Sequence, residues 1–167
     1  VSGYRTDQNP AQWRGYLDQI YTNPETVKRN KHLANDSDGH MNALPYADAP
    51  TFVSELRKQE AVSARALEFT ILTGSRTKPV RFMTWNQIDC ESKTWTIPAN
   101  LMKTKREFKV ALSSAALAIL KELPRVSDYV FPGGKADQPM SENAMLKLLE
   151  RMNRSDITVH GFRSTFR

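Results

Sequence analysis

The spacing of hydrophobic positions divides the chain into two parts that differ in regularity. Residues 9–20 carry three large apolar side chains at helical spacing, which predicts a short helix. Residues 22–44 contain few large apolar side chains and many Asn, Asp, Lys and Ser, a composition typical of a linker. Regular periodicity begins only beyond this stretch. We therefore expect the end of one domain over residues 1–21, a linker, and a second domain over residues 45–167.

The second part predicts a series of helices. The first, of about 15 residues, follows Pro45. The next is capped by Ser63, ends at Gly74 and is apolar over most of its surface, so we expect it to be largely buried. A short helix started by Pro79 is expected over residues 78–85.

Strand periodicity interrupts these helices once. Residues 94–97 are rich in Thr, Trp and Ile, and residues 108–112 alternate apolar and polar side chains, which predicts a hairpin or small sheet. A basic turn, residues 102–106, lies between them. Helical spacing returns over residues 113–123 and again after Ser141, which is a good N-cap.

The predicted fold class is α+β, mainly helical, with a small antiparallel sheet. The last residues, 159–167, look like the beginning of one more helix. They carry two phenylalanines, Phe162 and Phe166, around which we expect exposed apolar surface because the helix is cut off after its start.

Composition and charge narrow the class of protein. The 167 residues include 24 Lys and Arg against 18 Asp and Glu, a net charge of +6, and the sequence pI is about 9.5. The single cysteine, Cys90, excludes an intrachain disulfide framework and a zinc site built from cysteines, and it fits a reducing compartment such as the cytosol. No apolar run approaches the roughly 20 residues that span a bilayer. The basic excess suits an anionic partner, most commonly nucleic acid.

Four basic residues are the candidate chemical groups: Arg76 after the buried helix, Lys103 in the basic turn, and His160 with Arg163. Two guanidinium groups can bind the non-bridging oxygens of a phosphodiester, while Lys or His can donate a proton to a leaving oxygen. Such chemistry needs no metal and no cofactor. Each residue also has a plainer interpretation, since Arg76 can cap carbonyls at a helix end and the basic turn can be a solvated surface.

Five motifs stand in a fixed order along this second part. The first is Thr73-Gly74-Ser75-Arg76, with Trp85 and Ile88-Asp89 downstream. The others are Thr94 to Pro98, Met102 to Ser113, which begins with the basic turn that holds Lys103, Tyr129 to Pro132, and His160-Gly161-Phe162-Arg163. In this order they resemble the tyrosine recombinase (phage-type integrase) family, most of all the integrases of satellite phages and genomic islands.

The resemblance implies a role for each candidate residue. Arg76 and Arg163 would hold the scissile phosphate, and His160 would assist proton transfer and phosphate binding. Lys103 would protonate the leaving 5′ oxygen, with Lys105 as the competing candidate. The family cuts one DNA strand at a time through a tyrosine nucleophile, leaves a 3′-phosphotyrosine, and uses neither metal nor ATP.

The resemblance also implies partners and domains. Double-stranded DNA at the attachment sites of a mobile element would be bound by a homotetramer in the bacterial cytoplasm, at the nucleoid. Accessory DNA-bending proteins are compatible with this picture, and a membrane is not involved. Residues 1–21 would end a core-binding domain, residues 22–44 would cross the DNA, and residues 45–167 would belong to the catalytic domain. The residues expected to contact DNA are Lys28, Arg29, Lys31, Lys105 and Arg106.

Two departures from the family pattern affect the expected chemistry. The carboxylate that the family places three residues after the first arginine falls on Pro79, which cannot accept a hydrogen bond from Arg76. All five tyrosines precede His160, and none matches the position of the nucleophile. We therefore expect a fragment without the C-terminal segment that does not cleave DNA alone. The alternative is a non-enzymatic DNA-binding remnant or regulatory module on the same scaffold.

Overall fold

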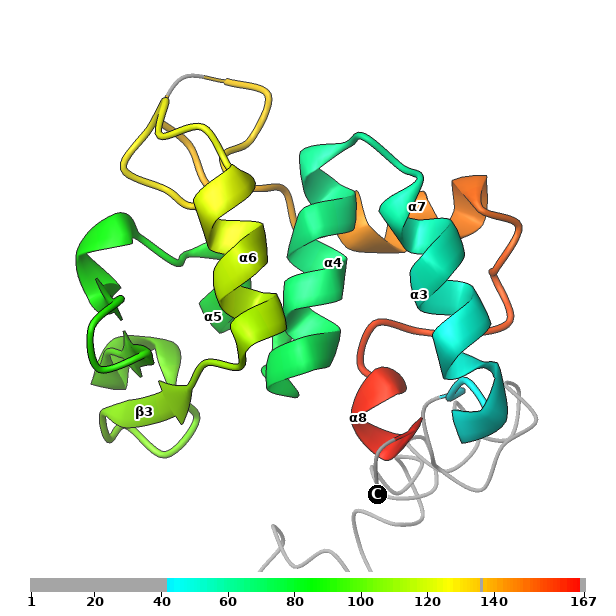
Figure 1. Cartoon of the computed structure of the whole chain (residues 1–167), viewed down its shortest axis with the longest axis horizontal. Coiled ribbons are helices and arrows are strands. Elements are labelled where there is room, and N and C mark those ends of the chain that lie inside the picture. The colour runs from blue at the N-terminus through cyan, green and yellow to red at the C-terminus, as the bar shows by residue number, and fades with distance from the viewer. Residues whose placement is uncertain (1–41, 136, 166–167) are drawn as a thin grey trace, which may run out of the picture. The chain divides into compact units, whose positions relative to one another are not determined.

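Helix α4 (Val62–Thr73) lies at the centre of the fold. The computed structural model describes residues 42–135 and 137–165, so the predictions for residues 9–20, most of the linker, and Lys28, Arg29 and Lys31 fall outside the described residues. In chain order the other elements are η2 (Tyr46–Asp48), α3 (Ala49–Arg57), α5 (Thr77–Arg81), η3 (Trp85–Gln87), β1 (Ile88–Asp89), β2 (Thr94–Ile97), η4 (Ala99–Leu101), β3 (Phe108–Ala111), α6 (Ser114–Glu122), α7 (Ala144–Arg151) and α8 (Phe162–Thr165). Figure 1 shows α4 between α6 and α3, and it also contacts α5 and α7.

The composition of α4 explains its central position. Its buried residues point in several directions around the axis, which suits a helix surrounded by others. As predicted, the helix stops at Gly74, whose φ of 57° is the left-handed conformation common after a helix C-terminus. The predicted cap at Ser63 is wrong. The helix begins two residues earlier, at Val62, and the backbone N–H of Ala64 bonds to the carbonyl of Ala61 instead.

Helices α3 and α5 are shorter than the sequence predicts. The helix expected over about 15 residues consists of the one-turn η2 and the nine-residue α3, which begins just before Pro50. Helix α5 has five residues, and Pro79 is its third rather than its first. A proline is tolerated there because the first backbone donors of a helix have no partner within it. The predicted helices are therefore present in the structure, and only their first and last residues differ from the prediction.

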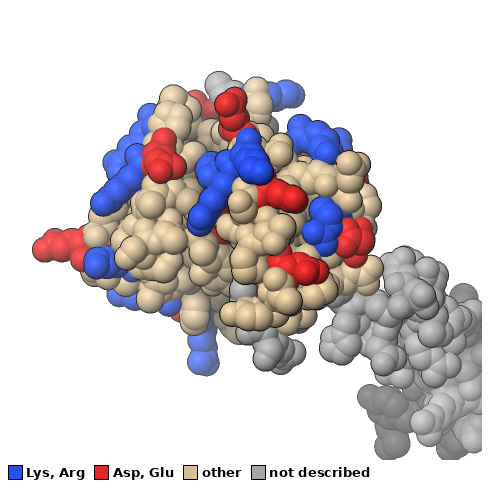
Figure 2. Space-filling model, turned by 45° about the vertical axis from the view of Figure 1, so that its right-hand side comes forward, with Lys and Arg blue, Asp and Glu red and all other residues tan. Residues whose placement is uncertain are grey.

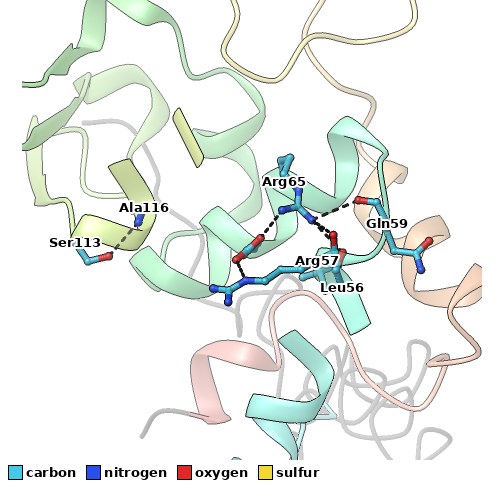
Figure 3. A network of polar contacts seen from close by, with 7 residues as sticks. Leu56, Arg57, Gln59, Arg65, Ser113 and Ala116 are labelled. Atoms are coloured by element: carbon cyan, nitrogen blue, oxygen red, sulfur yellow. Dashed lines mark hydrogen bonds and ion pairs between the residues drawn. The ribbon is translucent and has the colours of Figure 1, made fainter. Parts of the chain in front are cut away.

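The buried carboxylate of Glu68 links α3 to α4 through an ion pair with Arg57. Glu68 of α4 is only 2% exposed, and its Oε1 accepts a hydrogen bond of 2.6 Å from Nε of Arg57. Nη1 of Arg65 lies 3.0 Å from the other carboxylate oxygen. Arg65 also donates from Nη2 to the carbonyls of Leu56, Arg57 and Gln59, at the end of α3 (Figure 3). The arginine thus binds carbonyls at the end of α3, where the last C=O groups have no partner one turn further along the helix. No pattern in the sequence predicts this network.

The strands form an antiparallel three-stranded sheet in the order β1-β2-β3. The predicted hairpin of β2 and β3 is confirmed, with Trp95 opposite Val110 and Ile97 opposite Phe108. The short strand β1 was not predicted. The turn between β1 and β2 begins at Asp89, whose carboxylate accepts hydrogen bonds from the backbone N–H groups of Glu91 and Ser92. Trp95 is fully buried, and its ring lies 5.6 Å from that of Phe69, so the sheet packs on α4.

Helices α6 and α7 flank α4 and match their predicted spans closely. Ser113 caps α6 by accepting a hydrogen bond from the N–H of Ala116. The predicted cap of α7 is wrong, since the hydroxyl of Ser141 makes no cap bond and its carbonyl accepts from Ala144 instead. The apolar stripe of α7 is buried as expected. Among the described residues, no helix has the length and apolar character needed to cross a membrane.

The segment that ends with α8 is attached to the first described residues. The hydroxyl of Thr165 donates to the carbonyl of Leu44 at 2.8 Å, and the N–H of Thr158 donates to the carbonyl of Asn42. Phe162 packs on Phe52 of α3, with ring centroids 5.1 Å apart. Phe162 is only 3% exposed. The expectation of exposed apolar surface at Phe162 is therefore wrong, and Phe166 lies outside the described residues.

Candidate functional site

A cavity of about 400 Å³ opens where the end of α4, the sheet and α8 meet. Residues from three distant parts of the sequence line it: Thr73, Gly74, Ser75, Arg76 and Pro79 after α4, Ile97, Met102, Phe108, Lys109, Val110 and Ala111 around the hairpin, and Arg163 of α8. Of the four predicted catalytic residues, the structure brings Arg76 and Arg163 together in this cavity. Lys103 and His160 do not line it.

The backbone after α4 sets the position of Arg76. Gly74 leaves the helix in the left-handed conformation, and Arg76 is extended as the residue before α5. Arg76 is exposed and makes no hydrogen bond or ion pair with the described residues. Its guanidinium therefore keeps all its donors for a ligand. Pro79 is buried and lines the same cavity.

Arg163 is fixed by a contact with the end of α4. Its Nη1 donates a hydrogen bond to the carbonyl oxygen of Gly74, 89 residues earlier in the sequence. A cation at a helix C-terminus is favoured by the helix dipole. The capping role that we considered for Arg76 thus belongs to Arg163. An arginine has five N–H donors, so Arg163 retains others for a bound anion.

The basic turn lies at the edge of the cavity. Met102 lines the cavity, and Lys103, the next residue, is exposed. Lys105 is also exposed and has a φ of 52°, the left-handed conformation that closes the turn with a hydrogen bond from its N–H to the carbonyl of Met102. Arg106 is exposed as well. None of the three cations lines the cavity, and each belongs to a segment next to its wall.

His160 immediately precedes α8. It is exposed, and its carbonyl accepts the backbone N–H of Arg163. The adjacent Gly161 is buried so closely against the backbone at Asn42 and Ala43 that a Cβ atom there would overlap it. The residue beside His160 is therefore held tightly, although the imidazole itself does not line the cavity.

Two further residues of the cavity were not predicted as site residues. Phe108 appears in the sequence as a strand position, and Lys109 as one more cation near the basic turn. An aromatic residue that directly follows a basic turn and an acidic residue is the only signal that the sequence offers for Phe108. Lys109 also lines the cavity, but its position between Phe108 and Val110 on β3 puts its side chain on the opposite face of the sheet.

The charged residues that line the cavity are all basic. The cavity lining includes two arginines and no carboxylate. By contrast, Figure 2 shows a face on which Lys and Arg alternate with Asp and Glu. No group of three or more His, Cys, Asp or Glu within the part of the chain that the structure describes could hold a metal ion. The arrangement is suited to binding an anion through guanidinium groups.

Comparison with known proteins identifies the family. The model of the phage integrase family matches residues 43–167, which include both arginines and the whole described sheet. The chain belongs to the phage integrase family. Among the relatives of this integrase-family chain is the prophage integrase IntZ of Escherichia coli (strain K12), 38% identical over 77% of the chain and 33% of that protein. The integrase of Enterobacteria phage P4 is 29% identical over 90% of the chain and 39% of that protein. The chain thus spans about a third of the length of these relatives.

Solved structures show that this integrase-family chain has the fold of a tyrosine recombinase catalytic domain. The XerH site-specific recombinase bound to its difH substrate has a TM-score of 0.61 at 18% identity, covering 76% of this chain and 42% of that one. A lambda integrase tetramer bound to a Holliday junction gives 0.59 at 15% identity, covering 77% and 42%. The predicted fold class, mainly helical with a small antiparallel sheet, is confirmed.

Proposed function

We propose that this chain is part of a site-specific DNA recombinase that integrates and excises a mobile element, and that the cavity binds the scissile phosphate. The observation that carries the proposal is the convergence of Arg76 and Arg163 on one cavity whose lining contains no carboxylate. Family membership and DNA-bound proteins of the same fold support it.

The two guanidinium groups supply the electrostatic part of the reaction. A phosphodiester under attack gains negative charge on its non-bridging oxygens, and fixed donors aimed at those oxygens stabilise the transition state. Arg76 and Arg163 each offer planar N–H pairs that match two such oxygens. Because Arg163 is bound to the end of α4, it enters the reaction already oriented.

In the proposed reaction, a tyrosine oxygen forms a bond to phosphorus while the bond from phosphorus to the 5′ oxygen breaks. The leaving 5′ oxygen takes a proton from Lys103, with Lys105 as the competing donor, and His160 assists proton transfer. Attack by a 5′ hydroxyl of the partner strand reverses these steps and rejoins the DNA. Both lysines project from a turn next to the cavity wall, so closure of this turn onto DNA is part of the proposal.

The nucleophile comes from outside the 167 residues in this proposal. The described tyrosines, Tyr46 and Tyr129, do not line the cavity, and the other three are within residues 1–21. We assign residues 1–21 to the end of a core-binding domain and residues 22–44 to a linker across the DNA. The complete enzyme acts as a tetramer on two sites in the bacterial nucleoid, with accessory DNA-bending proteins where the site requires them.

The test uses a longer protein, with the reading frame continued beyond Arg167. In cells that carry the mobile element, excision is measured by amplifying the junction of the circular DNA that the excised element forms. The covalent protein–DNA adduct is measured separately, after denaturation of the protein. Arg76→Ala and Arg163→Ala should abolish both products while leaving duplex binding largely intact. Arg151→Ala, an exposed arginine of α7 outside the cavity, is the matched control. Normal excision by both cavity variants would contradict the proposal.

A non-enzymatic DNA-binding module is the second candidate function. The observation that favours it is that neither described tyrosine lines the cavity. The same assay separates the two functions. Duplex binding without an adduct, even by the longer protein, supports the binding module, whereas an adduct supports the recombinase.

A further inference from the structure

Phe108 lies on the buried face of the sheet but is not covered. Residues directly opposite each other in an antiparallel pair share a face, as do residues two apart on one strand. Phe108 is opposite Ile97, and its second neighbour Val110 is opposite Trp95. Trp95 and Ile97 are at most 3% exposed, yet Phe108 is 53% exposed. The face of the sheet that packs on the core therefore extends beyond the core at Phe108, where no other element of the described chain covers it.

The uncovered part of this face forms one wall of the cavity. Phe108 lines it together with the apolar side chains of Ile97 and Met102, while Arg76 and Arg163 line it from the end of α4 and from α8. The cavity thus combines an apolar surface with guanidinium groups. A phosphate ion alone would use only the guanidinium groups, because nothing in it can pack against a phenyl ring.

We propose that Phe108 binds the nucleoside that carries the phosphate held by Arg76 and Arg163. A nucleoside joined to a phosphate has the same two properties as the cavity, since its sugar carbons are apolar and the phosphate next to them is anionic. Aromatic side chains pack on such groups without reading base sequence. A volume of about 400 Å³ is in the range of small-molecule sites. This inference rests on the proposed function.

The first experiment compares two probes by NMR on the 167-residue chain. Inorganic phosphate and the dinucleotide thymidylyl-thymidine are titrated separately, and the side-chain signals of Arg163 and Phe108 are followed. The arginine signal should shift with both probes. The Phe108 ring signal should shift with the dinucleotide only. A ring signal that does not respond to the dinucleotide overturns the inference.

The second experiment measures duplex binding by fluorescence anisotropy at several salt concentrations. Phe108→Ala should weaken binding by about tenfold, within the range for aromatic contacts with bases, with an unchanged slope of log affinity against log salt. Phe108→Leu should regain part of the affinity. Val126→Ala is the matched control, because Val126 is 74% exposed and outside the cavity. Wild-type affinity of Phe108→Ala, or a reduced salt slope in that variant, contradicts the inference.

Failure of the proposed function would give a different result. If the cavity does not bind phosphate, Arg163 will not respond to inorganic phosphate. Arg76→Ala will also not lower the salt slope, which should otherwise fall by about 0.9 for each phosphate that the protein no longer neutralises. If phosphate binds normally and only the Phe108 effects are absent, the proposed function stands and the nucleoside contact is wrong.

Discussion

Arg163 donates a hydrogen bond to the carbonyl oxygen of Gly74, and both residues line the same cavity. The contact joins α8 to the end of α4 and places Arg163 near Arg76, only two residues beyond Gly74. The position of Arg163 in the cavity therefore depends on an intramolecular hydrogen bond. This bond uses one N–H donor of the Arg163 guanidinium, and the remaining donors are the ones proposed to bind phosphate.

Arg163→Lys should separate charge from geometry. Lysine keeps the positive charge but lacks the planar fork with which an arginine binds two phosphate oxygens in parallel. We expect phosphate affinity to fall by about tenfold and the free energy of unfolding by about 1 kcal/mol. Phosphate titration by NMR and urea denaturation measure these quantities. Arg151→Lys is the control, and equal behaviour of the two variants would refute the geometric role of Arg163.

Gly161→Ala should destabilise the chain strongly. A Cβ at this position would overlap the carbonyl of Asn42 and come within 3.0 Å of the Cα of Ala43, both of which are backbone atoms. Forcing an atom into such a contact costs about 1–3 kcal/mol. Gly134→Ala is the matched control, since nothing lies within 4 Å of its added Cβ. Urea denaturation of both variants is the measurement, and similar midpoints would contradict the packing at Gly161.

The two arginines that bind Glu68 should differ in their contribution to stability. The Arg65 side chain is 19% exposed and also binds three carbonyls at the end of α3, whereas that of Arg57 is 56% exposed. Arg65→Ala should therefore lower the free energy of unfolding by about 3 kcal/mol, and Arg57→Ala by about 1 kcal/mol or less. Denaturant unfolding of the pair provides the comparison. A larger decrease for Arg57→Ala would reverse the assignment.

Substrate chemistry can distinguish Lys103 from Lys105 as the proton donor. In the longer protein, Lys103→Ala should slow strand cleavage by about 100-fold, and Lys105→Ala much less. A substrate with sulfur in place of the leaving 5′ oxygen needs no proton donor, because a thiol has a pKa of about 8.5 and leaves as the thiolate. Sulfur should therefore restore cleavage by Lys103→Ala. Rescue of Lys105→Ala instead would transfer the role to Lys105.

Asp156 should titrate below the usual range of an aspartate. Arg154 donates to both carboxylate oxygens at 2.9 Å, and these hydrogen bonds lower the pKa of Asp156 from 3.8. A lowered folded-state pKa gives stability that is present above pH 3.8 and lost as the pH falls through the folded-state pKa. Because Asp156 is mostly exposed, the contribution is small. Carboxyl NMR titration measures the midpoint, and Arg154→Gln should raise it.

Hydrophobic periodicity is sufficient to predict α3, α4, α6 and α7, because these helices bury continuous apolar faces. The prediction of α5 rests on Pro79, and that of the β2–β3 hairpin on β-type residues in one strand and alternation in the other. Residue type does not predict the caps of α4 and α7, because the backbone N–H groups at these helix starts bond to backbone carbonyls rather than to side chains. Ser63 and Ser141 are good caps by residue type, but at each of these helix starts the donor bonds to a backbone carbonyl instead. The strand β1 was missed because two residues are too short for alternation to be visible.

The candidate site was predictable in part. The order of motifs led to Arg76 and Arg163, and the structure places both in one cavity. Contacts between distant segments could not be inferred. The bond from Arg163 to Gly74 and the exposure of Phe108 depend on the register of the sheet and on the position of α8, which no local pattern encodes.

The attachment of residues 157–165 has a consequence for synthesis of the protein on the ribosome. The bonds from this segment to Asn42, Leu44 and Gly74 join residues 116, 121 and 89 positions apart. Helix α4 contacts α3 and α6, which are all synthesised before α8, so Arg163 emerges long after Arg76 and after these helices. A nascent chain therefore has a cavity that still lacks its second arginine, and Arg163 joins it only after all the other lining residues have been synthesised.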